Sequence, residues 1–281
     1  MPIEVKNISY IYDQGMPFEK KALDDVSITI KDASITGIIG STGSGKSTLI
    51  QHFNALLVPT TGEVVVEGTE TKKWDKKALR RKVGLVFQYP ETQLFGETVF
   101  ADIAFGPQKQ GLKPDEIEGR VVNALKLVGL DSSAYRDRSP FKLSGGEKRK
   151  VAIAGVLACH PEIIVLDEPT AGLDPVSRKA FLELVVGFKK EGHTLVMVSH
   201  DMDEVAGIAQ NVIIMGDSRV IFEGATDEAF SQPDLLRSAG LDVPALSSVA
   251  HKLRNAGFSI PRKTFDAQEL AMVIAGQLNR Q

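Results

Sequence analysis

The feature that most constrains this sequence is a glycine-rich segment at residues 40–48, GSTGSGKST. An apolar run precedes it at residues 35–39 and another follows at residues 49–53, which predicts a strand, a tight turn and a helix. Glycines at positions 40, 43 and 45 let successive backbone N–H groups approach phosphate oxygens, and the start of the helix adds a positive partial charge. The segment therefore predicts a nucleoside triphosphate site.

Each residue type in this segment has a role in such a site. We expect Lys46 to reach the β- and γ-phosphates and the hydroxyl of Ser47 to bind Mg²⁺. The remaining members would surround the phosphates with backbone and hydroxyl groups: Gly40, Ser41, Thr42, Gly43, Ser44, Gly45 and Thr48.

Charge and cysteine content indicate which partners and which cellular compartment suit the protein. The formal net charge of −3 over 281 residues does not favour a general affinity for nucleic acid. Cys159 is the single cysteine, so we expect no disulfide framework and a reducing compartment. The sequence shows no signal peptide, and no apolar run approaches the roughly 20 residues of a spanning helix. We therefore expect a cytoplasmic chain that meets a membrane only through a partner.

Polar residues follow three apolar strands, at the points where open α/β sheets place ligand groups. Gln88 follows the run at residues 83–87, and His200 follows the run at residues 194–199. Asp167 and Glu168 follow the run at residues 163–166, and two adjacent carboxylates there are costly to bury without a cation or a shared proton. Beside a phosphate loop, we expect Asp167 and Gln88 to bind Mg²⁺, and Glu168 and His200 to act on the attacking water. Taken alone, Gln88 also suits an ordinary turn.

The segment LSGGE at residues 143–147 has two readings. Ser144 and Glu147 form a capping box, which alone explains both residues as the start of a helix. Gly145 and Gly146 would weaken a first helical turn, so they indicate a ligand that approaches bare N–H groups.

The middle of the chain predicts a helical insert. Residues 90–111 carry apolar residues without clear periodicity, and an amphipathic helix begins at Pro114. Exposed aromatics there would form a docking groove for a partner, or they would form the core of a helical subdomain. Residues 225–281 lie beyond the nucleotide motifs, and their apolar stripes indicate either simple packing or a contact between two ATP-binding subunits.

In order and spacing, these motifs resemble the full set of an ABC-type ATPase. The set comprises residues 40–47 (Walker A), Gln88 (Q-loop), 143–147 (signature), 163–168 (Walker B), 171–174 (D-loop) and His200 (H-loop). The resemblance implies an α/β P-loop nucleotide-binding domain over residues 1–224, with a mostly parallel sheet and an N-terminal antiparallel β subdomain. It also implies a helical subdomain at about residues 90–158, a helical extension at residues 225–281, and the cofactors ATP and Mg²⁺.

The same resemblance implies a head-to-tail dimer. Ser144, Gly145, Gly146 and Asp174 of one subunit would close over the ATP bound to the other. The family position also identifies Tyr12 as the residue that stacks on adenine, whereas the strand pattern alone leaves Tyr10 as an alternative.

Residues 87–95, 98–99 and 102–107 resemble more narrowly the ATPases of energy-coupling factor importers of the cobalt and vitamin type. The loop at residues 15–19 resembles that of the second of two paralogous ATPases in the shared vitamin module. The implied partners are a second ATPase subunit (a heterodimer is favoured and a homodimer is possible), a transmembrane coupling protein and an exchangeable substrate-binding membrane protein. The chain would then be a peripheral protein on the cytoplasmic face of the cell membrane, and its ATP hydrolysis would drive uptake of vitamins or transition-metal ions.

Other classes remain as alternatives. A soluble ABC-type ATPase acting on DNA or ribosomes would carry a long coiled coil or a second cassette, and this sequence shows neither. An ATPase of another ABC importer class shares the same motifs. A small-molecule phosphotransferase would leave residues 144–147 and His200 unexplained.

Overall fold

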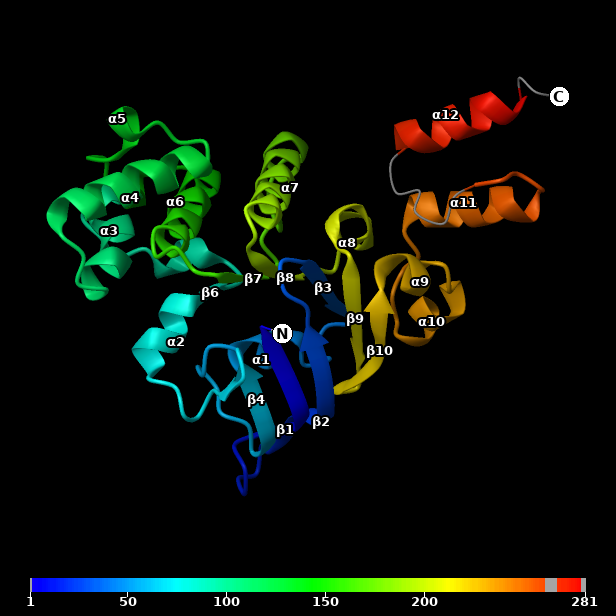
Figure 1. Cartoon of the computed structure of the whole chain (residues 1–281), viewed down its shortest axis with the longest axis horizontal. Coiled ribbons are helices and arrows are strands. Elements are labelled where there is room, and N and C mark those ends of the chain that lie inside the picture. Colours follow the sequence, from blue (N-terminus) through cyan, green and yellow to red (C-terminus); the bar gives the residue numbers. More distant parts are fainter. Residues whose placement is uncertain (1, 261–266, 279–281) are drawn as a thin grey trace.

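Two β-sheets form the centre of the molecule in a computed structural model that describes residues 2–260 and 267–278 (Figure 1). The smaller sheet is antiparallel, with strand order β2-β1-β4-β5. Its strands are β1 (Ile3–Tyr12), β2 (Lys20–Ile30), β4 (Thr61–Val66) and β5 (Thr69–Glu70). Apolar residues that alternate along β1, such as Ile3 and Val5, are buried on one face, as expected for a sheet with one solvated side.

The larger sheet has the order β10-β9-β3-β8-β7-β6, in which only β10 runs antiparallel to its neighbour. Its strands are β3 (Ile35–Gly40), β6 (Val83–Val86), β7 (Ile163–Asp167), β8 (Thr194–Val198), β9 (Asn211–Gly216) and β10 (Arg219–Ala225). Strands β3, β6, β7 and β8 are buried at every position, which explains their continuous apolar sequences. The predicted α/β architecture with a mostly parallel sheet is confirmed.

Most of the helices lie to either side of a central helix, α7 (Figure 1). The helices before it are α1 (Lys46–Gln51), α2 (Lys76–Lys82), η1 (Pro90–Gln93), α3 (Val99–Lys109), α4 (Pro114–Leu127), α5 (Ser132–Tyr135), η2 (Pro140–Lys142) and α6 (Gly145–Leu157). Then come α7 (Pro175–Lys190), α8 (Met202–Ile208), α9 (Thr226–Phe230), α10 (Pro233–Ser238), α11 (Ala245–Asn255) and α12 (Ala267–Leu278). None of the helices in the described ranges is both long and apolar enough to cross a membrane.

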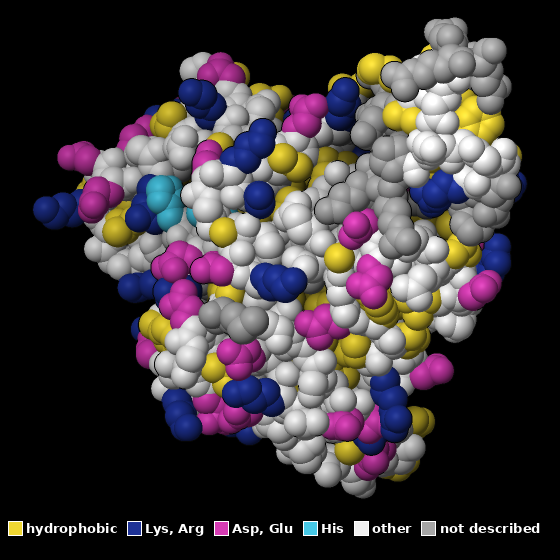
Figure 2. Space-filling view, turned by 45° about the vertical axis from the view of Figure 1, so that its right-hand side comes forward, with side chains coloured by type: hydrophobic (Ala, Val, Ile, Leu, Met, Phe, Trp, Pro, Cys, Tyr) yellow, Lys and Arg dark blue, Asp and Glu magenta, His cyan; other side chains and the backbone are white. Residues whose placement is uncertain are grey.

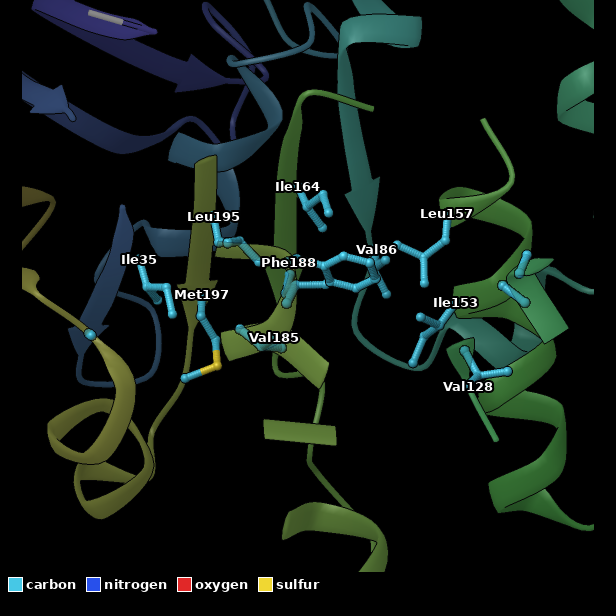
Figure 3. Packing of buried hydrophobic residues seen from close by; sticks show 14 of the residues in the cluster. Ile35, Val86, Val128, Ile153, Leu157, Ile164, Val185, Phe188, Leu195 and Met197 are labelled. Atoms are coloured by element: carbon cyan, nitrogen blue, oxygen red, sulfur yellow. The ribbon is translucent and has the colours of Figure 1, made fainter. Parts of the chain in front are cut away.

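The main hydrophobic core joins the larger sheet to the helical segment α3–α6 and to α7. Figure 3 shows the ring of Phe188 from α7 directed toward Val86 of β6, with Leu195 of β8 on one side and Leu157 of α6 on the other. This packing fixes α6 and α7 relative to the ends of the parallel strands.

The parallel strands present their carboxyl ends at one edge of the larger sheet. Val198 of β8 is in register with both Ile38 of β3 and Asp167 of β7. The phosphate loop after β3, the carboxylates at the end of β7 and His200 after β8 therefore emerge side by side.

The C-terminal part divides between two hydrophobic clusters. Phe230 of α9 and Leu236 of α10 belong to the main core, whereas Ala250, Ile260 and Leu270 form a separate small cluster with α11 and α12. The chain thus passes from the main core to the separate cluster near residue 244, later than the predicted domain boundary at residue 225. The domain boundary itself stays a prediction. The predicted contact of this extension with a second subunit is likewise not tested by a single chain.

The surface carries charges of both signs. On the face shown in Figure 2, Lys and Arg side chains are interspersed with Asp and Glu side chains, and apolar side chains lie between them. The described residues on this face form no large area of one sign.

Candidate nucleotide-binding site

The phosphate loop has the predicted strand, turn and helix around it. Gly43 and Gly45 adopt φ angles of 82° and 101°, and Gly45 lies directly before the first residue of α1. A side chain at position 45 would collide with the backbone carbonyl oxygen of Ala22, whereas one at position 43 would meet no atom within 4 Å. Gly45 is therefore required by packing inside the chain, and the open side of Gly43 leaves room for a ligand.

Lys46 lies across this loop. Its ammonium donates hydrogen bonds to the carbonyl oxygens of Gly40 at 2.7 Å and Ser41 at 2.9 Å. Burial lowers the pKa of Lys46, and the carboxylates of Glu168 and Asp167 only partly offset that effect. A partly buried cation whose charge is only partly balanced favours the arrival of an anion such as a phosphate group.

A pocket of about 360 Å³ opens beside the loop and contains Tyr12 but not Tyr10 among its lining residues. The hydroxyl of Tyr12 lies 3.2 Å from Oγ1 of Thr48, and its ring meets that of Tyr10 edge to face at 4.8 Å. Of the two candidate aromatics, Tyr12 is thus the one that borders the phosphate loop. Phe18 also lines this pocket with 85% of its surface exposed, and sequence reasoning missed it.

Asp167 and Ser47 form the candidate Mg²⁺ site. Asp167 is buried with 4% of its surface exposed, and its Oδ1 atom has no hydrogen-bond partner within the described ranges. Burial raises the pKa of Asp167, and a hydrogen bond from Ser47 opposes that rise. A buried carboxylate with an unsatisfied oxygen beside a hydroxyl suits a hard cation that prefers oxygen ligands.

Glu168 and His200 meet at the same edge. His200 Nδ1 lies 2.6 Å from Glu168 Oε2, and the carboxylate is mostly buried while the imidazole is mostly exposed. Glu168 adopts a left-handed φ of 48°, and its N–H donates to the carbonyl oxygen of Val198 at 3.0 Å. A non-glycine residue in this region stores strain, which is typical of functional positions.

Arg149 of α6 supports the backbone on which Glu168 lies. This buried guanidinium donates to the carbonyl oxygen of Glu168 at 2.7 Å and to that of Ala171. Burial lowers the pKa of Arg149. The sequence offered one signal for this role, which is an arginine on the buried face of a predicted helix.

Gln88 lies just beyond β6, and its side chain is exposed. Tyr89 follows it with a left-handed φ of 56°. The structure places Gln88 at the predicted end of the strand, while its role toward Mg²⁺ or water stays a prediction.

Ser144, Gly145 and Gly146 of the signature segment are exposed, and the segment lies outside the nucleotide pocket of its own chain. The capping box is present, because the Glu147 N–H donates to Ser144 Oγ at 3.4 Å and the Ser144 N–H donates to the Glu147 carboxylate at 2.8 Å. Ser144 Oγ also donates to this carboxylate at 2.7 Å. The Tyr135 hydroxyl donates at 2.6 Å to the same carboxylate, and these bonds, with that of Tyr135 the strongest, lower the pKa of Glu147 to about 2. A side chain at Gly145 or Gly146 would meet no atom within 4 Å, so this chain does not itself require glycine there.

Asp174 is exposed at the start of α7. Its Oδ1 accepts hydrogen bonds from the N–H groups of Val176 and Ser177, each at 3.0 Å. Val176 next to it is 79% exposed, which leaves this turn open to a partner.

A second feature is an apolar groove of about 360 Å³ beside the segment that follows Gln88. Phe95 and Phe105 line it, with 59% and 42% of their surfaces exposed, and their rings meet edge to face at 4.9 Å. Val99 and Ile103 from the same segment are buried in the main core. The segment therefore contributes residues both to the main core and to an exposed groove, while the docking of a partner in that groove stays a prediction.

Comparison with known proteins agrees with this geometry. Residues 23–171 match the family model described as ABC transporter. The chain is 54% identical to the energy-coupling factor transporter ATP-binding protein EcfA2 of Symbiobacterium thermophilum, over 99% of this chain and 97% of the relative. It is 50% identical to the protein of that name in Clostridium acetobutylicum, over 94% of each chain.

Solved structures show the same fold. The structure of cbiO1 from Clostridium perfringens, part of the ABC transporter complex cbiONQ, matches with a TM-score of 0.73 and 37% identity, over 88% of this chain and 97% of the other. The dimeric ATP-binding cassette MJ0796, bound to ADP and Pi after hydrolysis, matches with a TM-score of 0.72 and 29% identity, over 80% and 98%.

Proposed function

The chain belongs to the ABC transporter family as an ATP-binding subunit of an energy-coupling factor transporter, and we propose that it drives import from the site at the edge of its larger sheet. Subunits of this class hydrolyse ATP to power transport. The observation that carries the assignment of residues is the meeting of Lys46, Asp167 and the Glu168–His200 pair at one sheet edge. The reading as an ATPase acting on nucleic acid or ribosomes is not favoured, because the transporter relatives match along nearly the whole chain.

In this proposal, each residue of the site has one task. Tyr12 stacks on adenine, the N–H groups of residues 40–48 surround the phosphates, and Lys46 balances the charge of the β- and γ-phosphates. Ser47 and Asp167, with Gln88, would hold Mg²⁺, which when bound neutralises charge on the phosphate oxygens. Glu168 accepts a hydrogen bond from the attacking water and polarises it, and His200 orients that water and the γ-phosphate. Most of the rate then comes from positioning and charge stabilisation.

The site would be completed by a second ATPase subunit. Ser144, Gly145, Gly146 and Asp174 are exposed, and the open space around the two glycines suits a phosphate that approaches from outside the chain. The dimeric state of the similar cassette MJ0796 supports this arrangement. We favour a heterodimer of two related ATPases, and a homodimer is the alternative.

The apolar groove would receive a helix of the transmembrane coupling protein. Phe95 and Phe105 expose large apolar surfaces in this groove, which Phe87 and Pro90 also line on either side of Gln88 in the chain, so movement at the nucleotide site would pass to that helix. The subunit would then act on the cytoplasmic face of the membrane, together with an exchangeable substrate-binding membrane protein. That protein would select the vitamin or transition-metal ion.

The catalytic role is tested by Glu168→Gln. This variant should bind ATP with unchanged affinity but hold the dimer closed, so light scattering should show a stable ATP-dependent dimer and phosphate release should fall by a factor of about 100 or more. Glu162→Gln is a matched control, because Glu162 lies just before the same strand and pairs with Lys82 far from the phosphate loop. Substantial steady-state hydrolysis by Glu168→Gln would contradict the role.

The partners are tested by affinity purification of the tagged subunit from gently solubilised membranes, with mass spectrometry of the proteins that accompany it. A second ATPase, a coupling membrane protein and several small membrane proteins are expected. Phe95→Ser combined with Phe105→Ser should lose the coupling protein, while Phe141→Ser, at an exposed aromatic outside the groove, should keep it. Recovery of soluble partners alone would overturn the assignment.

A further inference from the structure

Glu204 of α8 is a buried carboxylate that none of the roles above uses. Only 6% of its surface is exposed, and its Oε2 atom accepts hydrogen bonds from Thr170 Oγ1 at 2.7 Å and from Ser199 Oγ at 3.3 Å. A carboxylate inside a protein is costly to bury, so its partners indicate what it contributes.

Both hydroxyl partners belong to segments of the nucleotide site. Thr170 lies two residues after Glu168, and Ser199 lies directly before His200. One oxygen atom of Glu204 therefore ties together the two turns whose ends carry the Glu168–His200 contact of 2.6 Å.

The other carboxylate oxygen faces a third segment. Oε1 of Glu204 lies 3.4 Å from Nε of Arg178, which is within ion-pair distance, although neither atom makes a hydrogen bond of good geometry within the described part of the chain. Arg178 Nη1 donates to Asp201 Oδ2 at 2.9 Å, and Asp201 in turn caps α8. Arg178 is on α7, the helix whose N-cap is Asp174.

Stability alone gives a weak reason for this cluster. Burial raises the pKa of Glu204 above its ordinary value, so the charged form is held at a cost that the hydrogen bonds from Thr170 and Ser199 only partly offset. A well-packed apolar side chain often stabilises a protein as well as a buried ion pair does. A carboxylate adds directional hydrogen bonds that an apolar side chain cannot make, because both hydroxyls must point at one oxygen atom.

We propose that Glu204 is a positioning residue that sets the geometry of the Glu168–His200 pair by holding the turns at Thr170 and Ser199. In this role it acts only through those two hydroxyls. The inference rests on the proposed roles of Glu168 and His200.

The test compares two substitutions at Thr170 with one at Glu204, in the complex purified through this subunit. Thr170→Val keeps the shape but removes the hydroxyl, and Thr170→Ser keeps the hydroxyl. Thr170→Val and Glu204→Gln should each lower kcat for ATP hydrolysis about tenfold while the Kd for ATP changes less than twofold, and Thr170→Ser should restore most of kcat. Thr226→Val is the matched control, since Thr226 is also buried and its hydroxyl has no partner in the described ranges.

The outcomes separate the inference from its premise. Equal kcat for Thr170→Val and Thr170→Ser overturns the inference, and so does a loss in Thr170→Val that Thr226→Val reproduces with the same drop in thermal midpoint. Should Glu204→Gln fail to fold, the Thr170 pair still decides. Glu168→Gln is assayed in parallel, because sustained hydrolysis by that variant overturns the proposed catalytic role and this inference with it.

Discussion

Protonation of His52 should weaken the folded state as the pH falls. His52 directly follows α1, the helix of the phosphate loop, and it is completely buried. Its Nδ1 lies 2.7 Å from the carbonyl oxygen of Thr48, and its ring meets Tyr10 edge to face at 5.0 Å. Its Nε2 has no hydrogen-bond partner in the described ranges. The charged imidazolium would therefore bury a second N–H without an acceptor.

The size of the effect follows from the pKa. Burial lowers the pKa of His52 from 6.5 to about 4, and the hydrogen bond to Thr48 opposes this only in part. Because the folded-state value lies below the unfolded one, the neutral ring contributes its stability above pH 6.5, and this contribution is lost as the pH falls through about 4. At about 1.4 kcal/mol for each pH unit between the two values, the loss is on the order of 3 kcal/mol.

The assay is urea unfolding at a series of pH values from 7 to 4, for the unmodified protein and for His52→Phe. Phenylalanine loses the bond to Thr48, so the variant should be less stable at pH 7, but the gap should close or reverse by roughly 3 kcal/mol at pH 4. Phe53→Ala, which removes a fully buried ring that does not titrate, controls for the pH dependence of any destabilised variant. Parallel stability curves for His52→Phe and the unmodified protein would refute the reasoning.

Three further changes test local features. Gly45→Ala should abolish binding of a fluorescent ATP analogue, because its Cβ would meet the carbonyl of Ala22 at a positive φ. Phe53→Ala, at a fully buried ring, should cost about 3–5 kcal/mol of unfolding free energy by denaturant titration. Asp75→Ala removes the cap that accepts from the N–H of Ala78 at the start of α2 and should cost about 1 kcal/mol; an unchanged midpoint would argue against the cap.

Features of the site that depend on neighbouring residues in the sequence could be predicted. The turn around Gly43 and Gly45 has positive φ angles, which glycines directly after a predicted strand indicate. The meeting of Asp167, Glu168 and His200 follows from a general property, because parallel buried strands present their carboxyl ends at one edge. Continuous apolar runs indicated those strands clearly.

Features that depend on tertiary contacts could not be predicted. Glu204 has the same sequence context as any acidic residue in the first turn of a helix, and its burial arises only because α8 packs onto the sheet. Arg149 lies on the buried face of a predicted helix, but its contact with the carbonyl of Glu168 joins two segments that the sequence pattern does not bring together. Phe18 joined the nucleotide pocket through the return of β2 beside β1, which a linear pattern does not reveal.

The contact between Arg149 and the carbonyl of Glu168 bears on when each of the two nucleotides of the proposed dimer is hydrolysed. Ser144 caps α6 and Arg149 lies five residues further along, which is about 7.5 Å along a helix. In the proposed dimer, the N-terminus of α6 would contact the nucleotide bound to the partner subunit. Arg149, further along the same helix, binds the carbonyl oxygens of Glu168 and Ala171 beside the chain's own nucleotide site. If that dimer forms, a tilt of α6 that releases one nucleotide would also shift Glu168 at the other, so we expect hydrolysis at the two sites to be coupled.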